Sequence, residues 1–255
     1  MTEDDVLVRQ EGAVAVLTLN RPASLNAWDM AMQDTVRRRF GEFAADASVK
    51  AVVITGAGDR AFCAGQHLAE TADFGPEHVD GWLDNFRALY RAILEIDKPV
   101  VAAINGVAAG SGYQLTLLCD VRVAHPGVRM GQTEVSSGIP SITGMYLTTS
   151  ALGTSRTLEL MMSGRLMEAD ELKQVGLVHH LVPQGDVLDT AIKVAGQLAE
   201  QPSVAIALTK QRYRDLVTPG LWEAFEAARA IDRKAWASGQ PQQVMRDFFA
   251  ARRKA

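Results

Sequence analysis

Residues 98–120, KPVVAAINGVAAGSGYQLTLLCD, have the composition of a site that holds negative charge. A proline-led apolar strand, a glycine-spaced turn and a helical apolar run follow one another. A buried strand that opens directly into a helix leaves several backbone N–H groups unpaired at one point. The sequence therefore predicts an anion-holding turn, either for a dinucleotide pyrophosphate or for a developing enolate or oxyanion.

The dinucleotide alternative makes two demands that the chain does not meet. The G-x-x-x-G-x-G spacing from Gly106 to Gly112 also occurs in short-chain dehydrogenases, but there the turn lies in the first βα unit. A Tyr-x-x-x-Lys acid/base pair is also required, and no lysine stands four positions after Tyr113, Tyr146 or Tyr213. The spacing alone is a weak motif, so the turn fits an enolate or oxyanion better.

Composition excludes several classes of protein. The chain has 255 residues, 47% of them hydrophobic, and a net charge of −4 with no basic stripe, so we expect no nucleic acid partner. No apolar run approaches the ~18 residues of a membrane span, and the acidic start resembles neither a signal peptide nor a transit peptide. Cys63 and Cys119 are too few for a disulfide framework or a CxxC metal site. We expect a cytoplasmic protein with no membrane partner and no metal.

The hydrophobic pattern predicts alternating strands and helices, followed by a helical tail. Such repetition is typical of stacked ββα units with mainly parallel strand pairing. The predicted strands are 6–10, 13–19, 51–55, 99–104, 121–124 and 177–182, and the predicted helices are 29–47, 79–96, a segment ending at 119, and most of the chain after 186.

The tail after residue 200 carries many large apolar side chains, namely Trp222, Phe225, Trp236, Phe248 and Phe249. An isolated pair of helices could not bury them all, so the tail docks on the core or on another subunit. We divide the chain into a core with the active site, residues 1–200, and a helical C-terminal oligomerisation segment, residues 201–255.

Short motifs recur in order along nearly the whole chain. They are NRP and LNA at 20–22 and 25–27, AFCAG at 61–65, the stretch at 98–120, GQTE and GIP at 131–134 and 138–140, and SGR at 163–165. In this order they resemble the crotonase superfamily, also called the enoyl-CoA hydratase/isomerase family. The resemblance implies an α/β spiral of ββα repeats with a helical C-terminal segment. It also implies a homotrimer or a dimer of trimers, acyl-CoA thioester substrates, and no cofactor besides that coenzyme A thioester.

The resemblance assigns the anion-holding turn to one half of an oxyanion hole. Members of the family stabilise a thioester enolate with two backbone N–H groups, which correspond here to those of Gln66 and Ser111. Relatives usually have glycine at position 111. Because the donors belong to the main chain, other side chains at both positions are compatible with the hole.

The same resemblance implies a set of coenzyme A contacts. Ser24, Leu25 and Ala64 would contact the adenine end, while His67, Leu68 and Ala69 would lie along the pantetheine and the thioester. Arg60 stands where relatives are often basic; it either meets a coenzyme A phosphate or is an exposed loop arginine. His67 stands where many relatives have aspartate, and it either touches the acyl group or caps the following helix.

The acid/base residues are where the sequence departs from the family. Hydratases use two glutamates, of which the later is Glu134 and the earlier position is Gln114. An amide orients water but accepts no proton, so a mechanism with two carboxylates is excluded at these positions. Glu134 alone could take a proton from water and return it to the α carbon, especially if an apolar pocket raised its pKa towards neutrality.

Three hypotheses follow from this departure. The leading one is an acyl-CoA lyase, a 2-enoyl-CoA hydratase that uses Glu134. The second is another enolate reaction on the same scaffold, either double-bond isomerisation or cleavage of a hydroxyacyl- or carboxyacyl-CoA. Residues 133–140 resemble the corresponding loop of aromatic hydratase-lyases. The third is a catalytically silent coenzyme A-binding subunit. The acyl group itself is not encoded in a motif, since we expect its pocket to come from residues 71–89 and the C-terminal helices.

Overall fold

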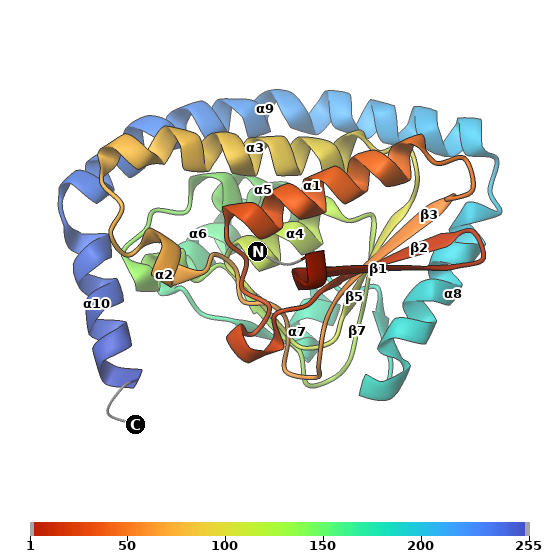
Figure 1. Ribbon diagram of the computed structural model, residues 1–255, viewed down its shortest axis with the longest axis horizontal. Coiled ribbons are helices and arrows are strands. Elements are labelled where there is room, and N and C mark those ends of the chain that lie inside the picture. Colours follow the sequence, from red (N-terminus) through yellow and green to blue (C-terminus); the bar gives the residue numbers. More distant parts are fainter. Residues whose placement is uncertain (1–2, 253–255) are drawn as a thin grey trace.

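Two β-sheets and a set of surrounding helices make up residues 3–252, the part of the chain that the computed structural model describes (Figure 1). The strands are β1 (Val6–Glu11), β2 (Val14–Leu19), β3 (Ala51–Gly56), β4 (Ala61–Cys63), β5 (Val100–Ile104), β6 (Val107–Ala109), β7 (Val121–Ala124), β8 (Arg129–Gly131), β9 (Met167–Glu168) and β10 (His180–Leu181). The α-helices are α1 (Met30–Ala45), α2 (Leu68–Thr71), α3 (Val79–Glu95), α4 (Ser111–Leu118), α5 (Ile142–Leu152), α6 (Thr154–Ser163), α7 (Ala169–Gln174), α8 (Val187–Ala199), α9 (Ser203–Ala237) and α10 (Gln240–Arg252). The 3-10 helices are η1 (Glu3–Asp5), η2 (Pro22–Ser24), η3 (Pro76–His78), η4 (Glu134–Ser137) and η5 (Gln184–Asp186).

The larger sheet has the strand order β1-β2-β3-β5-β7-β10. Its first pair is the expected antiparallel hairpin, which turns at Gly12 with a φ of +58°. All later pairs are parallel, with Val14 opposite Ala51 and Val101 opposite Val121. The prediction of mainly parallel pairing is therefore confirmed.

The smaller sheet, β4-β6-β8-β9, is absent from the sequence-based prediction. Its strands have two or three residues each, too few to show a period-two pattern. The predicted strand at 177–182 is likewise reduced to β10, His180–Leu181. The missing strands complete the ββα repeats, because β3 and β4, β5 and β6, and β7 and β8 each place one strand in either sheet.

The alternation of side chains along β3 explains how the large sheet separates two apolar layers. Val52 and Ile54 face the main core, which also contains the buried faces of α1 and α3. Ala51 and Val53 face the other way, towards Ala191 and its neighbours on α8. Successive side chains of a strand point to opposite faces, so a continuously apolar strand requires cover on both sides.

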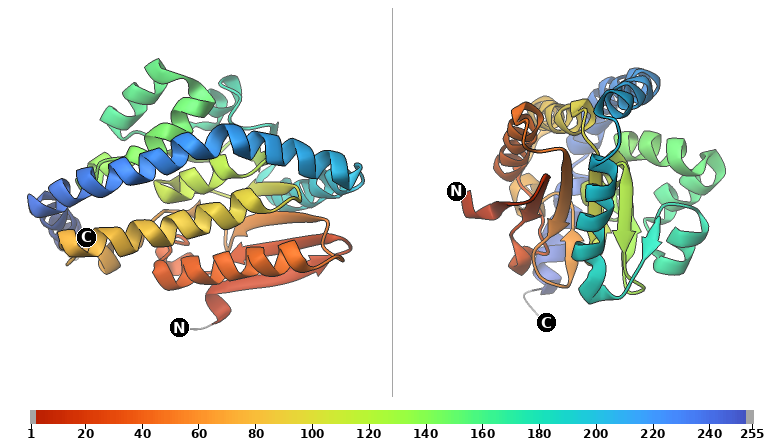
Figure 2. Two further views of the ribbon diagram at one scale, coloured as in Figure 1. Left: turned by 90° about the horizontal axis from the view of Figure 1, so that it is seen from above. Right: turned by 90° about the vertical axis from the view of Figure 1, so that its right-hand side faces the viewer.

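The C-terminal tail packs onto the core of its own chain. In Figure 2 the long helix α9 lies beside α3, and α3 lies beside α1. Phe225 and Trp236 are 1% exposed and belong to the main core, whereas Phe248 is exposed. No helix within residues 3–252 is long and apolar enough to cross a membrane.

A pair of glycine substitutions tests how tightly α4 packs against β4. A Cβ at Gly112 would lie 2.2 Å from the carbonyl oxygen of Cys63, whereas a Cβ at Gly41, on the exposed side of α1, would meet nothing within 4 Å. We expect Gly112→Ala to lower the free energy of unfolding by roughly 1–3 kcal/mol. Gly41→Ala should raise it by about 0.5–1 kcal/mol, because alanine favours a helix. Urea unfolding at one protein concentration measures both, and equal effects would contradict this packing.

Candidate active site

The anion-holding turn is a junction between the two sheets and α4. We predicted that the strand opens directly into the helix, which is wrong, since the short strand β6 lies between β5 and α4. β6 is followed by Gly110, which has a φ of +55° and directly precedes α4. Among the described residues, the backbone N–H of Ser111 has no hydrogen-bond acceptor. The N-terminus of α4 therefore presents a free donor, as predicted.

A second backbone turn packs against this one. Gly65, with a φ of +89°, approaches so closely that a Cβ there would lie 2.8 Å from the carbonyl oxygen of Ala109 and 3.3 Å from the nitrogen of Ser111. The next residue, Gln66, also has a backbone N–H without an acceptor within residues 3–252. Two free N–H groups thus come from neighbouring loops, the arrangement that an oxyanion hole requires.

Two asparagines hold the loops on which these turns depend. Asn26 is fully buried and donates to the carbonyl oxygens of Ala61 (2.8 Å) and Ala57 (3.0 Å). Asn105 donates to the carbonyl oxygen of Gly56 (2.9 Å) and accepts from its N–H (3.1 Å). Both side chains therefore replace the main-chain partners that the loop after β3 lacks.

Ser111 does not disturb the turn, although we expected glycine at this position from the family resemblance. The positive φ falls on Gly110, and Ser111 is not among the residues with a positive φ. Its hydroxyl oxygen accepts a buried hydrogen bond from Nε1 of Trp28 at 2.9 Å. The serine thus ties the start of α4 to the segment before α1.

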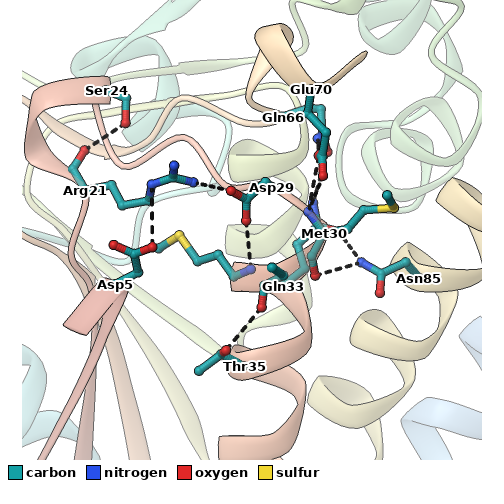
Figure 3. Close-up of polar contacts among 12 residues, drawn as sticks. Asp5, Arg21, Ser24, Asp29, Met30, Gln33, Thr35, Gln66, Glu70 and Asn85 are labelled. Atoms are coloured by element: carbon teal, nitrogen blue, oxygen red, sulfur yellow. Dashed lines mark hydrogen bonds and ion pairs between the residues drawn. The ribbon is translucent and has the colours of Figure 1, made fainter. Parts of the chain in front are cut away.

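The side chain of Gln66 belongs to a polar cluster beside the turn. Its Oε1 accepts hydrogen bonds from Gln33 (3.0 Å) and Trp82 (3.3 Å), and its Nε2 donates to Glu70. Figure 3 shows Gln66 and Glu70 beside Met30, whose N–H donates to the Glu70 carboxylate. The cluster fixes the side chain of Gln66 and leaves its backbone N–H available.

Glu134 lies over the glycine turn. A Cβ at Gly110 would be 3.3 Å from Oε1 of Glu134, so only glycine leaves the carboxylate its full space. The residue as a whole is half-buried, but its carboxylate oxygen Oε2 is completely buried. Burial raises the pKa of Glu134 to about 7, against the lowering effect of hydrogen bonds that include one from Gln114.

Gln114 is held in one orientation by its neighbours. Its Oε1 accepts hydrogen bonds from the hydroxyl groups of Tyr90 (2.7 Å) and Thr143 (3.0 Å), and its Nε2 donates to Oε1 of Glu134 (3.1 Å). Tyr90 is 1% exposed and Gln114 is 4% exposed. The amide therefore contacts the candidate acid/base group directly, and its second N–H remains able to orient a water molecule or a substrate oxygen.

A cavity of about 150 Å³ connects these groups. The part of its wall beside the two turns includes Ala64, Gln66, Leu68, Gly110, Ser111, Gln114 and Glu134. Another part of the wall includes Trp82, Leu83, Phe86, Phe225, Ala228 and Asp232. The second set comes from α3 and α9, the regions from which we expected the acyl pocket.

Sequence reasoning missed Asp232, a further carboxyl group in the wall of this cavity. It lies on α9, is 3% exposed, and its pKa is raised to about 7 by burial. A signal was present in the sequence, because Asp232 stands four positions after Ala228 and four before Trp236, inside the apolar stripe of the helix.

The residues expected to bind coenzyme A are only partly brought together. Leu25 lies next to the cavity residue Ala64, whose N–H donates to the carbonyl oxygen of Leu25 at 3.0 Å. Ser24 precedes Leu25 and is half-buried, with its hydroxyl donating to the carbonyl oxygen of Arg21 at 3.3 Å. Arg21 in turn bridges Asp29 (2.7 Å) and Asp5 (3.9 Å), which fixes the loop (Figure 3).

Arg60, His67 and Ala69 are not part of the cavity wall, whereas Leu68 is. The side chains of Arg60 and Ala69 are exposed. His67 occupies the N-cap position of α2, in line with the second alternative given for it, and its side chain makes no capping hydrogen bond. Its backbone N–H donates instead to the carbonyl oxygen of Trp28 at 2.8 Å. No group of three or more metal-binding side chains occurs in the described part of the chain.

Comparison with known proteins identifies the family to which this chain belongs. The family model for enoyl-CoA hydratase/isomerase matches residues 9–255. The chain belongs to the enoyl-CoA hydratase/isomerase family. The short-chain-enoyl-CoA hydratase of Clostridium acetobutylicum is 31% identical over 257 aligned residues, which cover 98% of this chain and 95% of that protein. The predicted crotonase-like fold and enzyme class are thereby confirmed.

Solved structures of the hydratase/isomerase family agree with this assignment. The crystal structure of an enoyl-CoA hydratase from Bacillus anthracis aligns with a TM-score of 0.79 at 30% identity and covers 88% of this chain and 89% of its own. A carnitinyl-CoA dehydratase from Mycobacterium avium aligns with a TM-score of 0.81 at 29% identity, covering 93% and 96%. Members with differently named acyl groups thus share the fold, so the fold alone does not select the acyl group.

The pKa of Glu134 predicts how stability changes with pH. Its folded-state pKa, about 7, lies above the ordinary value of 4.5, so the folded protein keeps a proton that the unfolded chain loses. The free energy of unfolding therefore falls as pH rises from about 4.5 to about 7. Glu134→Gln keeps the hydrogen bond from Gln114. Because glutamine does not ionise, the substitution removes this fall in the free energy of unfolding.

We expect the free energy of unfolding of Glu134→Gln to equal that of wild type at pH 4. At pH 8 it should exceed the wild-type value by up to about 3 kcal/mol. Denaturant unfolding at both pH values measures the difference. The same substitution at Glu223, an exposed residue of α9, should change stability little at either pH. A variant less stable than wild type at pH 8 would mean that the Glu134 carboxylate is not destabilised by burial.

Proposed function

We propose that this protein adds water to 2-enoyl-CoA thioesters, with Glu134 as the single acid/base residue. The observation that carries the proposal is the position of its buried carboxylate, directly over Gly110 and hydrogen-bonded to Gln114. A group with a pKa of about 7 is present in both protonation states near neutral pH, which suits a residue that takes a proton and returns it.

Hydration then needs one proton transfer in each direction. The Glu134 carboxylate removes a proton from water as the water oxygen bonds to the β carbon, and the double-bond electrons move onto the thioester oxygen. The N–H groups of Gln66 and Ser111 stabilise that enolate oxygen, each by an amount of roughly 3 kcal/mol in comparable sites. The enolate then collapses and takes the proton from Glu134 at the α carbon, so water has been added to one face.

Coenzyme A would extend from the cavity across the neighbouring loops. Ala64 and Leu68 border the cavity, and Ser24 and Leu25 lie beside Ala64. These positions support contacts with the coenzyme, and Arg60, exposed on the adjoining loop, is available to a phosphate group. We retain His67 and Ala69 as backbone contacts along the pantetheine, since their side chains lie outside the cavity wall. A homotrimer or a dimer of trimers stays our expectation for the assembly.

Gln114 also favours a second candidate reaction. With Glu134 beside the hole, the same site could remove a proton from the α carbon of a 3-enoyl-CoA and return it to the γ carbon, which is a double-bond isomerisation. That reaction needs no water, whereas hydration requires a water molecule held near Glu134.

An assay of the purified protein with 2-butenoyl-CoA and, separately, with 3-butenoyl-CoA distinguishes these reactions. We expect loss of the conjugated thioester absorbance with the first substrate and a kcat that falls by about 10²–10⁴ in Glu134→Gln. Glu223→Gln, an exposed glutamine substitution on α9, should behave as wild type. Conversion of only 3-butenoyl-CoA would favour isomerisation, and thioester binding without turnover of either would favour the silent subunit.

The pH profile provides an independent test. Both the hydration step and its reverse begin with an ionised Glu134, so kcat/KM should rise with pH through about 7 and then stay level. A bell-shaped profile would contradict a mechanism with one acid/base residue.

A further inference from the structure

Asp232 takes no part in the proposed hydration steps and has no hydrogen-bonding or ion-pair partner within residues 3–252, although its charge raises the pKa of Glu134. It lies on the buried face of α9, between Ala228 and Trp236, and contributes to the cavity wall. Its Oδ1 is fully buried and makes no hydrogen bond within residues 3–252. Because burying a carboxyl group without a partner is unfavourable, the residue is poorly explained as a packing element.

The basic residues nearest to Asp232 on α9 are engaged elsewhere. Arg229 pairs with Asp84 at 2.5 Å and with Asp80 at 3.5 Å, and Arg233 pairs with Asp80. Burial is the sole cause of the raised pKa of Asp232, so no cation compensates its charge. The carboxyl group lines the cavity, and its Oδ1 has no hydrogen-bonding partner among the described residues.

The part of the wall that α3 and α9 contribute is otherwise apolar and aromatic. Trp82 and Phe86 from α3 and Phe225 from α9 line it, and the hydroxyl of Ser141, another lining group, is buried without a hydrogen bond. The volume, about 150 Å³, equals that of an apolar protein cavity able to hold benzene. A short chain or one ring therefore fits, but a purely hydrocarbon occupant would leave the Asp232 carboxyl sealed without a partner.

We propose that Asp232 forms a polar subsite in the acyl pocket and selects acyl groups that carry a hydroxyl group at the end remote from the thioester. This inference rests on the proposed binding of acyl-CoA thioesters. A hydroxyl group both donates and accepts a hydrogen bond, so it satisfies Asp232 whether the carboxyl is ionised or protonated. The aromatic walls would hold the carbon skeleton, and Asp232 would act as a specificity-determining residue.

Binding of unreactive, saturated thioesters tests the subsite independently of turnover. One matched pair is hexanoyl-CoA and 6-hydroxyhexanoyl-CoA, and the other is 3-phenylpropanoyl-CoA and its 4-hydroxyphenyl analogue. By isothermal titration calorimetry, wild type should bind the hydroxylated member of at least one pair about tenfold to a hundredfold more tightly. The pair that shows the preference identifies an aliphatic or a phenolic hydroxyl as its source.

Substitutions then assign the preference to Asp232. Asp232→Leu should abolish or reverse it, whereas Asp232→Asn, which retains an acceptor oxygen, should keep part of it. Asp215→Asn, at an exposed position of the same helix, should bind as wild type. If Asp232→Leu fails to fold, the asparagine variant still decides. A preference that is reduced or lost there assigns the preference to Asp232, whereas a preference as large as that of wild type overturns the proposal.

Hydration of the corresponding 2-enoyl-CoA pairs separates this inference from the proposed function. Hydration with no hydroxyl preference in binding would overturn the subsite alone. A preference lost on substitution of Asp232, without any hydration, would overturn the hydratase proposal alone. An equal fall in kcat for all substrates in Asp232→Asn, with unchanged binding ratios, would overturn a specificity role in favour of a catalytic one.

Discussion

The close approach of two backbone turns is the constraint on which the rest of the site depends. Gly65 and Gly112 have no Cβ, so the end of β4 and the start of α4 come together over Cys63 and Ala109. Any side chain at either glycine would push the turns apart. The N–H groups of Gln66 and Ser111 are thus positioned by main-chain packing, and in the proposed reaction they would need little reorganisation as charge develops between them.

The same packing places one glutamate beside the two N–H groups. Gly110 leaves space for the carboxylate of Glu134, and Gln114 gives it a hydrogen bond without adding a second charge. A glutamate at position 114 would place two carboxyl groups in direct contact, which would push their pKa values apart. With glutamine, Glu134 has no second carboxyl group at position 114, and its pKa of about 7 is raised by burial and by the charge of Asp232. Asp232 is a further carboxyl of this cavity, and its neighbours on α3 and α9 place it in the acyl wall.

The sequence allowed prediction of the elements that have a clear period and of the loops that have a motif. The hairpin, β3, β5, α1 and α3 were predicted within a few residues of their bounds, because their apolar patterns are long enough to be distinctive. The smaller sheet was missed, since strands of two or three residues carry no periodicity. Glu134 and Gln114 came from the family resemblance, and the structure adds their contact and the roles of Tyr90 and Thr143. Asp232 was missed because an aspartate in a long, charged helix resembles a surface residue until the register of its apolar stripe is examined.

The vibrational frequency of a bound thioester carbonyl tests the central claim most directly. A 2-enoyl-CoA labelled with ¹³C at the thioester carbonyl can be bound to Glu134→Gln, so that turnover is slow, and observed by isotope-edited infrared spectroscopy. Two hydrogen bonds from the N–H groups of Gln66 and Ser111 would draw electron density onto the oxygen, so we predict a carbonyl stretch at lower frequency than that of the same thioester in water. A stretch at or above the frequency in water would show that the two turns do not form an oxyanion hole.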